Sequence, residues 1–474
     1  MSNNSKVFFV NRSDLLDRLE PKFYKTKYIS NLEKIYNGSY PVVSLDKITS
    51  LISDGTHFTP TYVNQGVKFI SVKDVRKGII SLNNTKFITE EEANSLDKRC
   101  KPQKDDVLLT KIGATFGYAS VVTTTERFQI FVSLALLRPK KDLIDPKYLE
   151  ILLNSKLAYV QFERVIKGAG VPDLHLEDIR KIKVPLPKID IQKKIVEVFK
   201  EQSNAINLKK NHLIKEIESI NPFLVKNILE DYSYDGKNTL SSRSFIRYAS
   251  DFYGQRWDSE GKQDKYNMLI SAINNGKYPS VKLGKVLSFI ESGSRPKGGV
   301  AHINSGILSL GGEHVNTQMG ITIKNKKFVD LDFHKKNLKT ETRLNDLLIV
   351  KDGATTGKVA IINDILHVGQ NVNEHVFLLR CSEVILPTYL LYFLWSNLGQ
   401  LQIEQAITGA TVTGITKDAL KNISISLPPK VIQEEITEVI EGTLANAHTL
   451  KNEINKMEIN VSSLMEKMII GEAV

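Results

Sequence analysis

Two glycine-rich segments of the sequence combine the residue types that commonly bind phosphate. KIGAT (residues 111–115) and KDGAT (351–355) each follow a predicted strand. Glycine permits a tight turn that exposes backbone N–H groups, and the lysine and threonine add a positive charge and a hydroxyl. Such a loop can hold a phosphate group, or it can be a turn that simply requires glycine. The candidate phosphate ligands are Lys111, Thr115, Lys351, Thr355 and Lys358.

The second segment has a superficial likeness to a nucleotide-binding P-loop. A P-loop has four residues between its glycine and its Gly-Lys pair, whereas Gly353 and Gly357 are separated by three residues. The patterns of zinc proteases, serine hydrolases, dinucleotide-binding folds and amino-methyltransferases do not occur either. We therefore interpret the chain as a recognition component rather than an enzyme, and we expect no catalytic residue, metal or cofactor of its own.

Two further pairs of segments carry donors suited to nucleic acid. SDGTHFTP (53–60) aligns with ESGSRPKG (291–298), and VKDVRK (72–77) aligns with GGEHVN (311–316). Arginine and lysine pair with guanine, asparagine pairs with adenine, and hydroxyls contact phosphates. The candidate DNA contacts here are Thr56, His57, Lys73, Arg76, Ser294, Arg295, Lys297 and Asn316. The copies share a glycine but differ in side chains, as expected of two units that read different sequences; relaxed constraint in a loop would look the same.

These paired segments belong to a duplication of the whole chain. Six blocks recur in the same order at offsets of 238 to 241 residues. For example, YPVVSLDKI (40–48) matches YPSVKLGKV (278–286), and RLEPKFY (18–24) is echoed by RWDSEGK (256–262). A period of about 240 residues is too long for a solenoid repeat, so the sequence predicts two tandem domains with pseudo-two-fold symmetry.

Each copy begins with short strands and continues with helices. Short β-branched runs bounded by Gly, Asn and Asp predict strands at 67–72, 107–112, 118–122, 306–310 and 346–351. Apolar residues at helical spacing predict short helices around 148–157 and 389–394. The predicted fold class is therefore α+β, with two tandem pseudo-symmetric domains.

A long helix is predicted after each copy. Apolar residues form one stripe from 195 to 228 and another from 432 to 468, and the second stripe includes Val439, Thr443 and Ala447. Each helix of about 40 residues is ~60 Å long. The matching stripes predict an antiparallel coiled coil; the alternative is that each helix packs on its own domain. The predicted domains are residues 1–187 and 233–428, with spacer helices at 188–232 and 429–474.

The composition excludes several classes of protein. The 474 residues are 41% hydrophobic and 25% charged, as in an ordinary soluble globular protein. We find no apolar run near the ~18 residues of a membrane helix and no secretory signal, and two cysteines cannot build a disulfide framework. A cytoplasmic location is expected. The net charge of +11 favours a polyanionic partner, although a basic surface can also serve solubility.

The ordered, duplicated set of motifs resembles the specificity subunit of type I restriction–modification systems. Each copy has a DGTHFTP-like and a K-x-G-A-T-x-G segment, then Pro-x-Pro or Pro-Pro, Q-x-x-I and a long helix. The resemblance covers residues 18–468 and implies two target recognition domains, each reading one half of a split double-stranded DNA site. SGSRPKGG in the second copy departs from the fuller DGTHFTP of the first.

The same resemblance implies partners. The helices would set the unread spacer and dock two copies of an adenine methyltransferase subunit, and endonuclease or translocase subunits could join. S-adenosylmethionine, ATP and Mg²⁺ would then belong to those partners.

Three alternatives are left open by the residues. The first is a DNA-cutting enzyme whose carboxylates form no recognisable pattern, which equivalent clusters in both copies would favour. The second is a helical scaffold that does not bind DNA, which weak salt dependence of DNA binding would favour. The third is a recognition subunit of another DNA-modification or phage-defence system.

Overall fold

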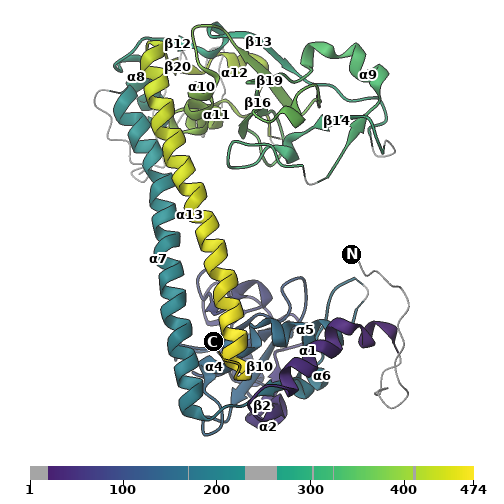
Figure 1. Ribbon diagram of the computed structural model, residues 1–474. Coiled ribbons are helices and arrows are strands. Elements are labelled where there is room, and N and C mark those ends of the chain that lie inside the picture. The colour runs from purple at the N-terminus through teal and green to yellow at the C-terminus, as the bar shows by residue number, and fades with distance from the viewer. Residues whose placement is uncertain are drawn as a thin grey trace. The chain divides into compact units, whose positions relative to one another are not determined.

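The chain divides into two compact units, and each contains one copy of the duplicated sequence. The computed structural model describes residues 20–168, 170–229, 264–300, 304–323, 325–408 and 413–473. Unit 1 comprises residues 1–210 and 452–474, and unit 2 comprises residues 211–451 (Figure 1). The repeated block RWDSEGK and the predicted domain boundary at residue 232 lie outside the described residues. The predicted domain limits stay predictions.

Unit 1 is built from small sheets and short helices. Its helices are α1 (Thr26–Tyr36), α2 (Leu45–Ile48), α3 (Glu90–Asp97), α4 (Pro146–Leu153), α5 (Lys156–Val165) and α6 (Leu176–Lys181). Its strands are β1 (Val42–Ser44), β2 (Thr49–Asp54), β3 (Val67–Ile70), β4 (Val75–Arg76), β5 (Ile79–Ile80), β6 (Lys86–Ile88), β7 (Val107–Thr110), β8 (Ala119–Val121), β9 (Phe128–Ile130), β10 (Leu134–Pro139) and β11 (Lys183–Pro185). The main sheet has the antiparallel order β2-β10-β7-β8, and a second sheet has the order β6-β3-β9.

Unit 2 repeats this architecture. Its helices are α8 (Asp264–Asn274), α9 (Leu331–Lys336), α10 (Pro387–Trp395), α11 (Asn397–Ala406) and α12 (Lys417–Lys421). Its strands are β12 (Ser280–Lys282), β13 (Leu287–Ser292), β14 (Ile307–Leu310), β15 (Phe328–Val329), β16 (Leu347–Val350), β17 (Val359–Ile361), β18 (Asn371–Val372), β19 (Val376–Cys381) and β20 (Ser424–Ser426). The sheet orders β13-β19-β16-β17 and β15-β14-β18 match those of unit 1, which confirms the predicted duplication and α+β class.

Local sequence signals explain where these elements form. All four residues of β7 and of β16 are buried, as expected of strands that read as continuous apolar runs. Helix α4 begins at Pro146, and the preceding Asp145 carboxylate accepts hydrogen bonds from the backbone N–H groups of Lys147 and Tyr148. That cap satisfies donors that have no partner within the helix. The predicted strands and short helices are confirmed.

Two long helices, α7 (Ile189–Ile228) and α13 (Lys430–Ile470), run antiparallel, and a segment of each lies side by side with the other within each unit (Figure 1). In unit 1, Lys209 Nζ lies 2.5 Å from Glu453 Oε2. In unit 2, Ile220 of α7 and Ile440 of α13 belong to one buried core. The predicted antiparallel pairing is confirmed. Among the described helices, none combines the length and the hydrophobicity needed to cross a bilayer.

The apolar stripe of α13 differs from the prediction at one turn. Val439 is 49% exposed, whereas its neighbour Ile440 is fully buried. Beyond this point the buried residues recur every seven positions, at Ile440, Ala447, Ile454 and Val461. The assignment of Val439 to the stripe is therefore wrong, because the stripe takes a four-residue step from Ile436 rather than a three-residue step.

A buried glutamine fastens the start of each long helix to the unit before it. Gln192 Oε1 accepts a hydrogen bond from the backbone N–H of Asp145 at 2.8 Å. Its Nε2 donates to the carbonyls of Leu143 and Pro187 at 2.9 and 2.8 Å. Gln433 makes the equivalent three hydrogen bonds at the start of α13. The repeated Q-x-x-I motif thus has a structural role in fixing the direction in which each helix leaves its sheet.

We predict that Gly55→Ala destabilises unit 1. A Cβ at this position would lie 1.9 Å from the carbonyl oxygen of Ile130, so the backbone must shift at a cost of about 1–3 kcal/mol or more. The urea midpoint of the purified chain measures the loss. Gly442→Ala is the matched control, since no atom lies within 4 Å of its added Cβ and alanine favours a helix. Equal midpoints for the two variants would contradict the close approach.

Candidate nucleic-acid interface

Four loops of unit 1 converge beyond one end of its main sheet. They are residues 55–60 after β2, 111–118 after β7, 131–133 before β10 and the described part of 166–174 after α5. Lys111 donates its backbone N–H to the carbonyl of Ser133 at 2.9 Å, and Gly113 donates to Pro172 at 2.9 Å. Thr56 donates in the same way to Ile130 at 3.2 Å. We call this the loop cluster of unit 1.

The corresponding loops of unit 2 meet in the same way. Ser294 donates its backbone N–H to Val372 at 2.8 Å, and Lys351 donates to His375 at 2.8 Å. Gly353 donates to Thr413 at 3.0 Å, as Gly113 does to Pro172 in unit 1. The loop cluster of unit 2 thus contains residues 293–299, 351–358, 373–375 and the described part of 408–415. In each unit, the SDGTHFTP-like segment and the GAT segment predicted from the sequence are thus brought together.

A buried ion-pair network lies at the centre of the unit 1 loop cluster. Asp54 Oδ2 lies 3.2 Å from Lys111 Nζ, and both side chains are almost completely buried. Arg99 Nη2 donates to Asp54 Oδ1 at 2.5 Å, and Asp173 Oδ1 lies 3.8 Å from Lys111 Nζ. Burial alone would raise the pKa of Asp54, but the hydrogen bonds from Arg99 and Lys111 and the charge of the lysine outweigh it, so this pKa lies below its ordinary value.

The predicted contacts of unit 1 differ in how accessible they are. His57, Lys73 and Arg76 are exposed, and Thr115 is half-buried. Lys73 and Arg76 adjoin the loop cluster, because the N–H of Val72 donates to the hydroxyl of Ser133 at 3.1 Å. Thr56 and Lys111 are buried: the threonine hydroxyl donates to the carbonyl of Phe58, and the lysine charge is engaged by carboxylates.

The predicted contacts of unit 2 show a similar range. Arg295 and Lys297 are exposed and line a shallow hollow of about 440 Å³ with Pro296, Gly298 and Gly299. The side chains of Ser294, Lys351, Thr355 and Lys358 are half-buried.

Asn316 of unit 2 is occupied by its own turn. Its Oδ1 accepts from the N–H groups of Gln318 and Gly320, and its Nδ2 donates to Thr322 Oγ1 at 2.9 Å. Whether any of these residues contacts DNA stays a prediction.

Arg99 is a residue of this site that the sequence did not reveal. It follows α3, and its backbone N–H donates to Leu96 at 3.0 Å. It stands 45 positions after Asp54, and the residue 240 positions later is Lys339 rather than arginine. Neither a motif nor the internal repeat marks it, so only the folded chain brings it to the loop cluster.

The loop cluster of unit 2 has its own set of charged groups. Arg295 Nε lies 2.7 Å from Glu374 Oε1. His375 lies between two carboxylates, with Nε2 3.1 Å from Glu374 Oε1 and Nδ1 2.5 Å from Asp352 Oδ1. Each loop cluster therefore holds an exposed arginine beside a less exposed carboxylate and a histidine, but the residues come from different positions of the repeat.

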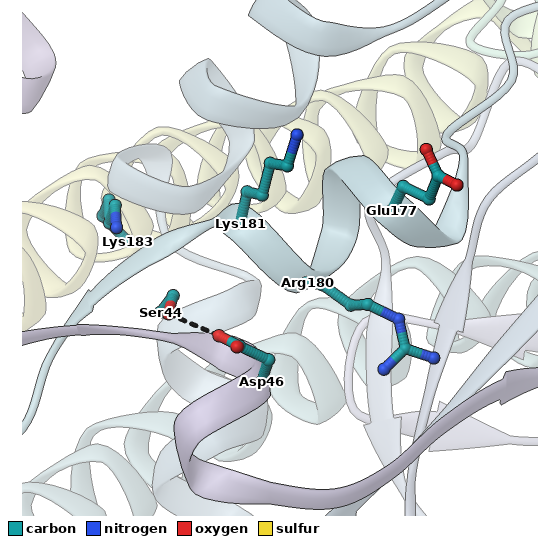
Figure 2. A pocket seen from close by; sticks show the side chains of 6 residues that line it. All are labelled: Ser44, Asp46, Glu177, Arg180, Lys181 and Lys183. Atoms are coloured by element: carbon teal, nitrogen blue, oxygen red, sulfur yellow. Dashed lines mark hydrogen bonds between the residues drawn. The ribbon is translucent and has the colours of Figure 1, made fainter.

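A separate hollow of unit 1, of about 430 Å³, mixes both charge signs. It is lined by Ser44, Asp46, Glu177, Arg180, Lys181 and Lys183. Figure 2 shows that these charged groups point in different directions, and Asp46 accepts a hydrogen bond from the Ser44 hydroxyl. Small-molecule sites are concave, mostly apolar and have converging polar groups. This hollow is concave, but its lining side chains are polar or charged and do not converge. In the part of the chain that the structure describes, no three His, Cys, Asp or Glu side chains are placed to hold a metal ion.

Comparison with protein-family models identifies the repeated unit. The type I restriction modification DNA specificity domain matches residues 22–219 and again residues 272–458. The chain belongs to this family. The two matched stretches correspond to the two copies of the sequence, each with part of the long helix that follows it.

Individual relatives of the specificity-domain family agree with this assignment. The type I restriction enzyme EcoBI specificity subunit of Escherichia coli is 31% identical over 134 residues, and this match spans only 28% of either chain. The type I restriction enzyme MjaIX specificity subunit of Methanocaldococcus jannaschii is 22% identical over 460 residues, covering 95% of this chain and 94% of that protein. A solved structure from work on complex assembly and conformational transition of the type I R-M system has the same fold. Its TM-score is 0.57 at 16% identity, over 92% of this chain and 99% of that one.

We predict that Asp54→Asn destabilises unit 1 by about 3–5 kcal/mol, because it leaves Lys111 buried with only the more distant Asp173 as a partner. Since the folded pKa of Asp54 is lowered, its stabilisation is complete above the unfolded value and is lost as pH falls through the folded pKa. The variant should therefore lose stability at neutral pH and show a shallower decline in acid. Urea titrations across pH measure both effects.

Glu291→Gln is the control for that prediction. It breaks the half-exposed pair between Glu291 and Lys417, in which Oε1 and Nζ are 3.1 Å apart, and we expect a cost below about 1 kcal/mol. Equal losses in the two variants would show that the Asp54 network contributes no more than a surface ion pair.

Proposed function

We propose that this chain is the DNA specificity subunit of a type I restriction–modification complex. Each loop cluster contacts one half of a bipartite double-stranded DNA site, and the long helices set the number of base pairs between the halves. The observation that carries the proposal is the pair of loop clusters. They have the same backbone framework and unlike exposed donors, as two readers of different half-sites require.

The other candidate functions have less support. A DNA-cutting enzyme would need equivalent catalytic clusters, yet the carboxylates described at the loop clusters lie against other side chains, namely Arg99, Lys111, Arg295 and His375. A scaffold without DNA binding leaves the exposed cations of both loop clusters and the net charge of +11 unexplained. The proposed subunit is non-catalytic and needs no cofactor of its own.

We further propose that the long helices bind two copies of an adenine methyltransferase subunit. Both helices expose large apolar side chains that their pairing leaves uncovered: Leu208, Ile214, Val431, Val439 and Ile459. Exposed apolar groups along paired helices are suited to a protein partner. S-adenosylmethionine would be bound by that subunit, and ATP and Mg²⁺ by endonuclease or translocase subunits if these join. The site of action is the cytoplasm.

The function is tested by mapping methylated adenines at base resolution in cells with and without the gene. We expect one split motif to lose methylation when the gene is deleted. Exchanging residues 1–186 for the first copy of another family member should then change one half-site and leave the other half-site and the spacer intact. A change in both halves would contradict independent reading, and a motif that persists without the gene would contradict the function.

A second test addresses the spacer. Seven residues are inserted into α7 between Phe199 and Leu213, and seven into α13 between Leu450 and Met457, so that the seven-residue register is kept. The insertion adds about 10 Å of helix, or roughly three base pairs at 3.4 Å each. We expect the methylated motif to acquire a spacer longer by about three base pairs. Replacing the same number of exposed residues without insertion is the control. An unchanged spacer in the insertion variant would exclude the proposal that the long helices set the spacer.

A further inference from the structure

Arg99 is held at the loop cluster of unit 1 by one edge of its guanidinium group. Nη2 donates to Asp54 Oδ1 at 2.5 Å, and Nε donates to the Asp54 carbonyl at 3.4 Å. The Asp54 side chain is 3% exposed, whereas that of Arg99 is 54% exposed. A buried carboxylate therefore fixes an arginine whose other edge faces solvent.

The Nη1 group of this guanidinium is available to a ligand. Among the described residues, none accepts a hydrogen bond from Arg99 Nη1. Nη2 also lies 3.0 Å from Nε2 of His57, which is itself exposed. The planar fork that matches O6 and N7 of guanine consists of Nη1 and the outer N–H of Nη2, so the exposed His57 ring must turn away from Nη2 when the base binds.

Unit 2 presents an arginine in a comparable way from a different part of the fold. The Arg295 side chain is 58% exposed, and its Nε lies 2.7 Å from Glu374 Oε1. By the internal repeat Arg295 corresponds to His57, not to Arg99. The two arginines are thus placed at the loop clusters independently, from different segments and by different carboxylates.

Fixing the side chain in advance matters for specificity. A free arginine or lysine has many rotamers, and part of this freedom is lost when the side chain binds. A lysine on a flexible stem contacts phosphates as a point charge, which gives affinity without sequence information. An arginine already held by a carboxylate loses less freedom and can present its fork in one orientation only.

We propose that Arg99 and Arg295 each read a guanine edge in the major groove, one in each half-site, and that Asp54 and Glu374 are positioning residues that hold them. The proposal rests on the DNA-recognition function given above and names the residues that determine specificity. Arg99 would add a contact to unit 1 that has no counterpart at the same repeat position in unit 2.

The test uses the full chain in complex with its methyltransferase subunit and a randomised DNA pool. Arg99→Lys keeps the charge and removes the fork. We expect one position of one half-site to lose its guanine preference by about tenfold or more, while the other half-site and the salt dependence of binding stay unchanged. Arg295→Lys should do the same in the other half-site. Lys141→Ala, which removes an exposed cation paired with Asp105, is the control and should leave the motif unchanged.

Asp54→Asn tests the positioning role. It should weaken the guanine preference at the same position as Arg99→Lys, and the double variant should show little further loss, because both changes remove one contact. If Asp54→Asn does not fold, Glu374→Gln with Arg295→Lys provides the same comparison in unit 2, where the carboxylate is less deeply buried.

Four outcomes are distinct. A motif unchanged in Arg99→Lys and Arg295→Lys would overturn base reading. So would a uniform loss of affinity for all DNA sequences in Arg99→Ala together with a shallower salt dependence, because that result indicates a phosphate contact. Loss of preference at positions unrelated to the arginine in Asp54→Asn would overturn the positioning role. If the wild-type complex selects no split motif, the proposed function itself fails, independently of the arginines.

Discussion

A buried glutamine at the start of each long helix is the interaction on which the arrangement of each unit depends. Gln192 and Gln433 each use all three of their hydrogen bonds on backbone groups that flank a short helix and a proline. A buried amide with unsatisfied groups is costly, so few other directions of the helix are compatible with these contacts. Each long helix therefore begins in a fixed direction relative to the short helix and the proline beside it within its own unit.

The two units share backbone positions in their loop clusters but differ in the exposed side chains that these positions carry. Gly55 and Gly293 occupy the same position in the two units, and each approaches a neighbouring carbonyl too closely for any side chain. Two positions after these glycines the side chains are exposed and differ, with His57 in unit 1 and Arg295 in unit 2. Because the backbone is alike and the exposed donors differ, the two recognition units share one framework but present different hydrogen-bond donors.

Much of the fold could be predicted because its signals are local. Helical and strand periodicities lie within short windows, and a repeat near 240 residues is visible without any structure. The predicted stripe of α13 was wrong at Val439, because a shift of one residue decides whether Val439 or Ile440 faces the partner helix. The convergence of the loops depends on β2 lying beside β10, which the sequence does not encode locally. Arg99 could not be found for the same reason, since its partner Asp54 is 45 residues away.

The charges of the chain act at two levels. The net charge of +11 and exposed lysines such as Lys73 and Lys297 attract any polyanion, and this attraction falls as salt increases. Discrimination among base sequences requires donors with a fixed direction. The donors that we propose for this role are Arg99 and Arg295, each of which lies beside a carboxylate that offsets one positive charge. In the proposed mode of recognition, affinity and specificity are therefore assigned to different cations within each loop cluster.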